Sequence, residues 1–218
     1  MIAGGASPQG SKSLINNTWE SEGMVGLGRR WARSLATVHH RLQVVSPWPL
    51  PAQSAAILAC NHISFADPLF LQAACPRLIA WMIAEEYYCK PGIHWVCSKI
   101  RAIPVNRSGH DLRATRQALR ALREGRILGV FPEGRLATGS ELLPFHTGAA
   151  LLASRSGVPL VPARIEGTTR GTQTILEAWW MPHRVTLAFG SPLDLGHDTS
   201  HEALEAATRK LRQAIELL

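Results

Sequence analysis

From residue 55 onward, short apolar segments alternate along the chain with segments of helical periodicity. The apolar segments predict strands at residues 55–60, 78–83, 101–106, 127–131, 160–165 and 184–189. The segments between and after them predict helices at residues 68–74, 111–124, 147–156 and 201–217. Apolar strands separated by helices form sheets that are buried on both faces. The pattern therefore predicts an α/β fold with a mixed, mostly parallel sheet covered by helices on both faces.

The chain divides into three predicted parts. Residues 1–18 are rich in Gly and Ser, which is typical of a flexible tail. Residues 19–47 carry apolar side chains at helical spacing and predict a helical, membrane-associating region. Prolines at positions 47, 49 and 51 interrupt regular structure, because proline fixes φ and lacks a backbone donor. Residues 48–218 form the predicted α/β domain.

An excess of positive charge points to an anionic partner. The 218 residues carry a formal net charge of +7 at pH 7, which suits nucleic acid or an anionic membrane surface. Arg29, Arg30 and Arg33 stand beside Trp31, and a basic helix with tryptophan is typical of the bilayer interface. The same pattern also fits a helix that is docked on the domain with its charged face in solvent.

Two absences bear on location. No apolar run approaches the roughly 20 residues that a membrane-spanning helix needs, and the N-terminus lacks the apolar segment of a signal peptide. The four cysteines form no CxxC pair, so they predict neither a zinc site nor a disulfide framework and are expected to be buried thiols. We expect a peripheral protein on the cytoplasmic face of a membrane.

The first candidate site follows the first predicted strand. Asn61 and His62 come directly after that strand, and Asp67 precedes Pro68 at the start of a predicted helix. Asp is a favoured N-cap and Pro a favoured first helical residue, so a tight loop is expected to join strand end and helix start. At such an edge, Asp67 could hydrogen-bond one nitrogen of His62 and leave the other as a general base. The alternative is that Asp67 only caps its helix.

Further polar side chains stand at the ends of other predicted strands. Arg107 follows the third strand and can form a bidentate bond with phosphate. Glu133, Gly134 and Arg135 follow the fourth strand, where Gly134 permits a tight turn. Glu133 could pair with a cation or accept from a substrate hydroxyl, and Arg135 could hold phosphate.

Four ordered segments resemble the motifs of the glycerolipid acyltransferases, the lysophosphatidic-acid acyltransferase family. They are NHISFADPLFL at residues 61–71, RAIPVNR at 101–107, FPEGR at 131–135 and GVPLVPAR at 157–164. The second segment departs from the family pattern at Asn106, where many members carry an acid. The third has no residue between Gly134 and Arg135, and its continuation FPEGRLATG resembles the branch that acts on lysophosphatidylethanolamine.

The resemblance implies roles for individual residues. His62 would deprotonate the acceptor hydroxyl, which attacks an acyl thioester, while Asp67 orients His62. The substrate-binding residues it implies are Asn61, Arg107, Glu133, Gly134 and Arg135. The residues it implies for an acyl-chain channel are Val158, Pro159, Val161 and Pro162, although a core strand would need the same side chains.

The resemblance also implies the reaction and its partners. A fatty acyl group would pass from acyl-CoA or acyl carrier protein to the free hydroxyl of a lysophospholipid, with no metal and no other cofactor. The expected acceptor is 1-acylglycerol-3-phosphate, which gives phosphatidic acid in phospholipid biosynthesis, and lysophosphatidylethanolamine is the alternative. Two functions of another class stay open: a catalytically silent lipid-binding protein and a basic nucleic-acid-binding module.

Overall fold

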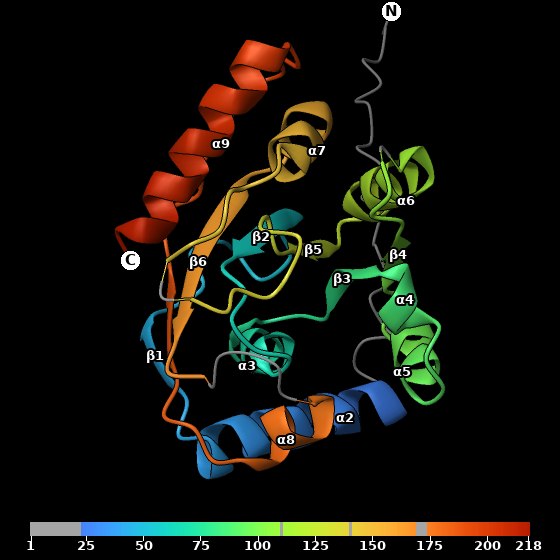
Figure 1. Ribbon diagram of the computed structural model, residues 1–218, viewed down its shortest axis with the longest axis vertical. Helices are drawn as coiled ribbons and strands as arrows, with labels where there is room; N and C mark the ends of the chain where they lie inside the picture. The colour runs from blue at the N-terminus through green and yellow to red at the C-terminus, as the bar shows by residue number, and fades with distance from the viewer. Residues whose placement is uncertain (1–22, 110, 140, 169–173) are drawn as a thin grey trace, which may run out of the picture.

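The structure, a computed structural model, describes residues 23–109, 111–139, 141–168 and 174–218 (Figure 1). Within them, seven strands form one sheet in the order β1-β7-β6-β2-β5-β3-β4. The strands are β1 (Gln43–Ser46), β2 (Ala56–Cys60), β3 (Ile79–Ala84), β4 (Ile103–Val105), β5 (Ile127–Val130), β6 (Leu160–Glu166) and β7 (Thr186–Phe189). Strands β6 and β7 pair antiparallel, and the other neighbours pair parallel. The predicted mixed, mostly parallel sheet is confirmed.

Helices cover both faces of this sheet (Figure 1). One face packs against the π-helical turn η1 (Leu35–His39), α3 (Asp67–Ala74) and α8 (Ile175–Trp180), and α2 (Met24–Ser34) packs on α3. The other packs against α6 (Leu112–Arg123), α7 (Gly148–Ser156) and α9 (His201–Glu216). Two short helices, α4 (Glu85–Tyr88) and α5 (Ile93–Lys99), follow β3.

Strand β2 lies at the centre of the sheet and determines where the candidate site forms. All five of its side chains are buried, and they alternate between the two hydrophobic cores as the pleat of a strand requires. Both neighbours of β2, strands β5 and β6, run parallel to it. Parallel strands end at the same edge, so the loops after β2 and β5 meet beyond their carboxyl ends.

The structure corrects the prediction of a helical region at residues 19–47. Helix α2 and η1 occupy part of it, but Gln43–Ser46 form strand β1 at the edge of the sheet, paired parallel with β7. The cause is tertiary: the exposed edge of β7 supplies a hydrogen-bonding partner to a short run that contains two β-branched valines. Trp19 and the predicted tail at residues 1–18 lie outside the described residues.

A buried histidine joins η1 to the region around α8. The His40 ring stacks on His183 at 5.3 Å between centroids and meets the edge of Phe70 in α3. Its Nε2 lies 3.0 Å from the carbonyl oxygen of Trp179. Burial, together with nearby His183 and His39, lowers the pKa of His40 below its usual value, which favours the neutral form. The N-terminal helices are therefore packed on the domain through a neutral ring.

The structure also shows where the cysteines lie. Cys60, Cys75 and Cys97 are buried as expected, whereas Cys89 is exposed because it lies at the surface end of α4. In the part of the chain that the structure describes, no helix combines the length and the apolarity needed to cross a membrane.

Candidate active site

His62 and Asp67 form a hydrogen-bonded pair beyond the carboxyl end of β2. The Nδ1 atom of His62 lies 2.9 Å from Oδ2 of Asp67, whose side chain is fully buried. This bond places the imidazole proton on Nδ1 and leaves Nε2 with a lone pair. Among the described residues nothing hydrogen-bonds to Nε2, and the His62 side chain is 16% exposed. The pair therefore has the geometry of an oriented, accessible general base.

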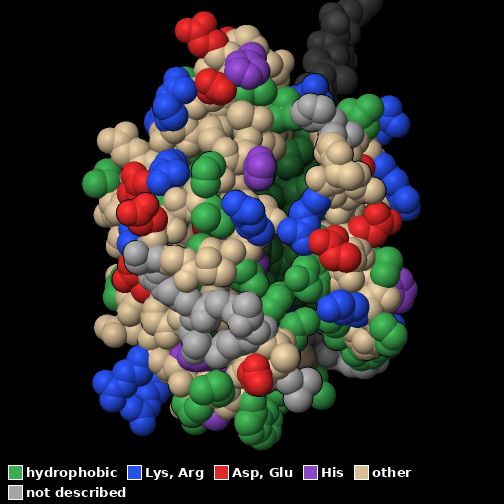
Figure 2. Space-filling model, in the orientation of Figure 1, with side chains coloured by type: hydrophobic (Ala, Val, Ile, Leu, Met, Phe, Trp, Pro, Cys, Tyr) green, Lys and Arg blue, Asp and Glu red, His purple; other side chains and the backbone are tan. Residues whose placement is uncertain are grey.

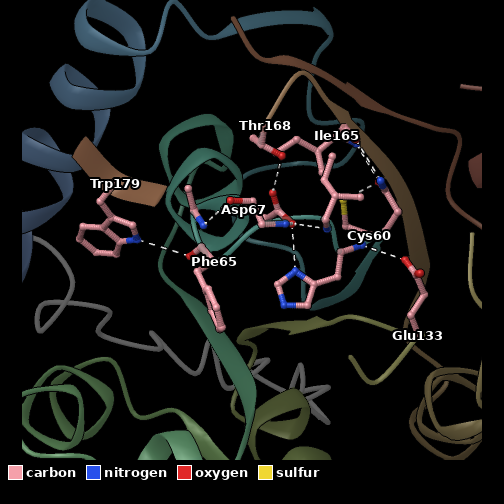
Figure 3. Close-up of polar contacts among 12 residues, drawn as sticks. Cys60, Phe65, Asp67, Glu133, Ile165, Thr168 and Trp179 are labelled. Carbon is pink, nitrogen blue, oxygen red and sulfur yellow. Dashed lines mark hydrogen bonds and ion pairs between the residues drawn. The ribbon is translucent and has the colours of Figure 1, made fainter. Parts of the chain in front are cut away.

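The predicted helix cap at Asp67 is wrong. Helix α3 begins at Asp67 with Ala66 as its N-cap residue, and the carboxylate points back into the preceding loop (Figure 3). Besides His62, Oδ2 accepts the backbone N–H groups of Ile63 and Ser64 at 2.8 Å each. Oδ1 accepts the hydroxyl of Thr168 at 3.1 Å. Asp67 thus organises the loop that carries His62 instead of the first turn of α3.

Glu133 holds the backbone of His62. Its buried carboxylate accepts the N–H of His62 through Oε1 at 2.8 Å and the N–H of Leu143 through Oε2 at 2.9 Å. The carbonyl of His62 accepts the N–H of Ala137 at 2.7 Å. Both carboxylate oxygens are buried and accept backbone N–H groups, so the structure gives Glu133 a positioning role, and the predicted substrate contact stays a prediction.

Asn61 likewise serves the fold at the end of β2. Its side-chain amide donates to the carbonyl of Ile165 at 3.0 Å, and its side-chain oxygen accepts the N–H of Ile165 at 2.8 Å. The side chain is buried, and the amide extends the pairing between β2 and β6 beyond the last residue of β2. The structure therefore shows a structural contact for Asn61, and the predicted substrate contact stays a prediction.

A stack of three rings fixes the plane of the His62 imidazole. His62 lies on Phe131 with 3.8 Å between centroids, and Phe131 lies on Trp81 at 5.2 Å. A Cβ added at Gly129 in β5 would come within 2.5 Å of the Trp81 ring, so only glycine leaves room for it. This stack was not predicted from the sequence, although a glycine inside an apolar strand is a sign of such close approach.

Arg107 joins the second and third sequence motifs. It donates through Nη1 to the carbonyl of Gly134 at 2.8 Å and through Nη2 to Glu86 in α4. Gly134 has a φ of +68°, which a side chain would strain, and the turn it forms presents this carbonyl. Arg135 is exposed and, within the described residues, makes no hydrogen bond or ion pair. Arg135 is therefore open to an anionic ligand.

A hollow lies on the face that Figure 2 shows. It separates the part of the molecule that carries α7 from the part that carries α4 and α6, with hydrophobic side chains inside and Lys or Arg side chains at its rims. A cavity of about 360 Å³ at this edge of the sheet is lined by Glu85, Glu86, Cys89, Asn106 and Arg107. An apolar interior with charged rims, which carry Asp or Glu as well as Lys or Arg side chains, suits a ligand that has a hydrocarbon chain and a charged head group.

Val158 and Pro159, the first two of the predicted acyl-channel residues, lie far from this site. Leu160 pairs with Ile57, and the carbonyl of Pro159 accepts the N–H of Ile57 near the start of β2. His62 follows the opposite end of that strand, roughly 15 Å away at about 3.3 Å per residue. Val161 and Pro162 are buried within β6, and Val158 lies before it. Val161 belongs to the core and Val158 packs against it, and the predicted acyl-channel role of these residues stays a prediction.

Comparisons with known proteins agree with this arrangement. The family model described as Acyltransferase matches residues 41–166, which contain His62, Asp67, Arg107 and Glu133. A Bacillus subtilis protein named 1-acyl-sn-glycerol-3-phosphate acyltransferase is 32% identical over 173 residues, 78% of this chain and 83% of that protein. The chain belongs to the acyltransferase family. Enzymes of this family move an acyl group from a donor to an acceptor.

Other relatives of this acyltransferase differ in the acceptor that their names state. A 1-acyl-sn-glycerol-3-phosphate acyltransferase of Borreliella burgdorferi is 31% identical over 124 residues, 55% of this chain and 48% of that protein. A lyso-ornithine lipid O-acyltransferase of Rhodobacter capsulatus is 27% identical over 179 residues, 72% of this chain and 64% of that protein.

The fold of the acyltransferase has a counterpart among solved structures. The crystal structure of the 1-acyl-sn-glycerophosphate (LPA) acyltransferase PlsC from Thermotoga maritima matches it with a TM-score of 0.68 at 22% identity. The match covers 90% of this chain and 83% of that one, so the two share the α/β architecture.

Proposed function

We propose that this acyltransferase moves a fatty acyl group from a thioester to the free hydroxyl of 1-acylglycerol-3-phosphate, which forms phosphatidic acid in phospholipid biosynthesis. The observation that carries the proposal is the His62 ring, held by the buried Asp67 with its Nε2 accessible. The names of the Bacillus and Borreliella relatives support the choice of acceptor. The donor is acyl-CoA or acyl carrier protein.

The proposed chemistry needs one base and no covalent enzyme intermediate. Nε2 of His62 takes the proton as the acceptor oxygen attacks the thioester carbonyl. The tetrahedral intermediate then collapses: the new ester remains, the carbon–sulfur bond breaks, and the imidazolium returns its proton to the leaving thiolate. Asp67 stabilises the imidazolium in between, and such base catalysis supplies about 10²–10⁴-fold in rate.

An acceptor panel tests the proposal directly. The purified enzyme is given palmitoyl-CoA or palmitoyl carrier protein with 1-acylglycerol-3-phosphate, lysophosphatidylethanolamine or glycerol 3-phosphate, and the products are identified by mass spectrometry. We expect phosphatidic acid as the main product. Acylation of glycerol 3-phosphate alone, or of no phosphate-bearing lipid, would refute the proposed acceptor.

The arginine beside the third-motif turn is expected to bind the acceptor phosphate. Arg135→Ala should lower kcat/KM for 1-acylglycerol-3-phosphate roughly tenfold to a hundredfold, because a hydrogen bond to a charged group contributes about 1.5–3 kcal/mol. The measurement is steady-state kinetics with each substrate varied in turn. Arg123→Ala, at an exposed position in α6, is the control. If Arg135→Ala changed only the KM of the donor, Arg135 would instead bind the phosphate of the donor.

The acceptor lies in a bilayer, and we propose that an apolar surface on α2 and α8 brings the enzyme to the cytoplasmic face of that membrane. The two helices lie side by side in Figure 1. The centroids of the Trp31 and Trp179 rings, one from each helix, are 6.3 Å apart. The large apolar side chains exposed there are Leu27, Trp31, Trp180 and Met181. Exposed Arg30 and Arg33 on α2 add the positive charge that attracts anionic lipids.

Vesicle flotation tests this surface. We expect binding to vesicles that contain phosphatidylglycerol, binding that weakens as salt rises, and its loss in the double variant Leu27→Ser/Trp180→Ser. Point variants are preferable to deletion of residues 1–45, because that deletion removes part of β1. The double variant Leu112→Ser/Leu217→Ser, at exposed positions on α6 and after α9, is the control. Equal binding by both variants would exclude the α2–α8 surface.

A further inference from the structure

A charged cavity lies beside the candidate active site. It forms where α4 follows β3 and where Arg107 follows β4, at the same edge of the sheet as His62. Two carboxylates, of Glu85 and Glu86, face one guanidinium, of Arg107, in its lining. The head group of an acceptor bound through Arg107 would therefore meet carboxylates as well as a cation.

Glu86 is the carboxylate that contacts Arg107. The ion pair is partly open to water, with 58% of the Glu86 side chain and 38% of the Arg107 side chain exposed. The Glu86 backbone N–H, and then Arg107, lower the pKa of its carboxyl, so it is ionised at neutral pH. Exposed ion pairs are weak. A phosphate can therefore take over the guanidinium, but Glu86 stays next to it as a negative charge.

The consequence for an acceptor depends on the charge of its head group. A phosphomonoester approaches a full second negative charge near pH 7, and Glu86 repels it. A phosphodiester that carries an ammonium group has a single negative charge and brings a cation, which Glu86 can bind once Arg107 has turned to the phosphate. The same residue thus penalises one class of lysophospholipid and favours the other.

We propose that Glu86 narrows the preference of the acceptor site for phosphomonoesters, by weakening their binding and by strengthening that of phosphate head groups that carry an ammonium. The inference rests on the proposed function, and on the bond from Arg107 to the carbonyl of Gly134, which places Arg107 beside the proposed phosphate ligand Arg135. It assigns the charge-dependent part of acceptor choice to one residue of α4, outside the four sequence motifs.

The test is a charge-removing substitution with two acceptors. For Glu86→Gln we expect kcat/KM to rise roughly threefold for 1-acylglycerol-3-phosphate and to fall by a similar factor for lysophosphatidylethanolamine, within the range of a surface ion pair. The ratio of the two kcat/KM values should change by about tenfold. Both acceptors carry the same acyl chain and are measured in the same mixed micelles. Thermal unfolding checks that the variant folds.

The matched control is Glu85→Gln, which removes an equal charge from the same cavity without touching Arg107. It should move the acceptor ratio less than Glu86→Gln does. An unchanged ratio in Glu86→Gln, or an equal shift in Glu85→Gln, would overturn the inference while wild-type acyl transfer still upheld the proposed function. A wild-type enzyme that acylates neither lysolipid would overturn both.

Discussion

His62→Ala is expected to lower kcat by about 10²–10⁴-fold, the contribution of general-base catalysis, while the protein stays folded. The substitution removes Nε2, which no other described side chain replaces at this position. Asp67 keeps its backbone donors at Ile63 and Ser64, so the loop retains most of its hydrogen bonds. The assay is thiol release from acyl-CoA in the presence of 1-acylglycerol-3-phosphate, with circular dichroism to verify the fold.

Two further variants show whether a loss of activity is specific to the base at position 62. His62→Gln retains a side chain that can hydrogen-bond to Asp67 but lacks a base, so it should be as inactive as His62→Ala. His201→Ala, which removes an exposed imidazole from α9, should keep wild-type turnover. If a folded His62→Ala enzyme turned over at the wild-type rate, the base would have to be another group.

Asp67→Asn is expected to lower both activity and stability. The carboxylate accepts four donors: the His62 ring, two backbone N–H groups and the Thr168 hydroxyl. An amide has a single acceptor oxygen, so its NH₂ would face one or more of these donors in a buried site. We expect a loss of roughly 1–3 kcal/mol in the free energy of unfolding, more than a helix cap would lose on conversion to Asn.

The loss of activity should be on the order of 10²-fold or more, because the imidazole is no longer held in the tautomer with its proton on Nδ1. Urea unfolding and steady-state kinetics on the same preparation separate the two effects. Thr168→Val removes only one of the four bonds and should cost about 1 kcal/mol with most activity retained. A destabilised Asp67→Asn enzyme with full activity would limit Asp67 to a structural role.

The features that could be predicted from the sequence depend on residues close together in the chain. His62 and Asp67 are five positions apart, so one tight loop brings them into contact whatever the rest of the fold does. The alternation of apolar strands and helices likewise depends on local periodicity, and it predicted the α/β architecture. The predicted bond from His62 to Asp67 formed, but the expected N-cap at Asp67 was wrong, because capping preference does not say which N–H groups lie within reach.

The remaining features required contacts between distant parts of the chain. Glu133 reaches a backbone N–H 71 positions away, and Asn61 pairs with Ile165 across 104 positions. Their residue types are compatible with substrate binding or with support of the loop, and only the folded backbone decides between these roles. The same holds for β1, since a four-residue apolar run becomes a strand only where a sheet edge offers it hydrogen bonds.

Strand order and register decided which side chains share the site. The apolar fourth motif, residues 157–164, was expected to line an acyl channel. The register of β6 against β2 places the first residues of this motif near the start of β2, far from His62. Glu86, in a four-residue helix without a sequence signature, reaches Arg107 because β3 and β4 are neighbours. The sequence by itself determined the fold class and the His62–Asp67 pair, which need only local geometry. The tertiary structure decided the contacts of Glu133 and Glu86 and the position of the cavity. Sheet pairing brings these residues to their partners, and nothing in the sequence indicates that such distant positions meet.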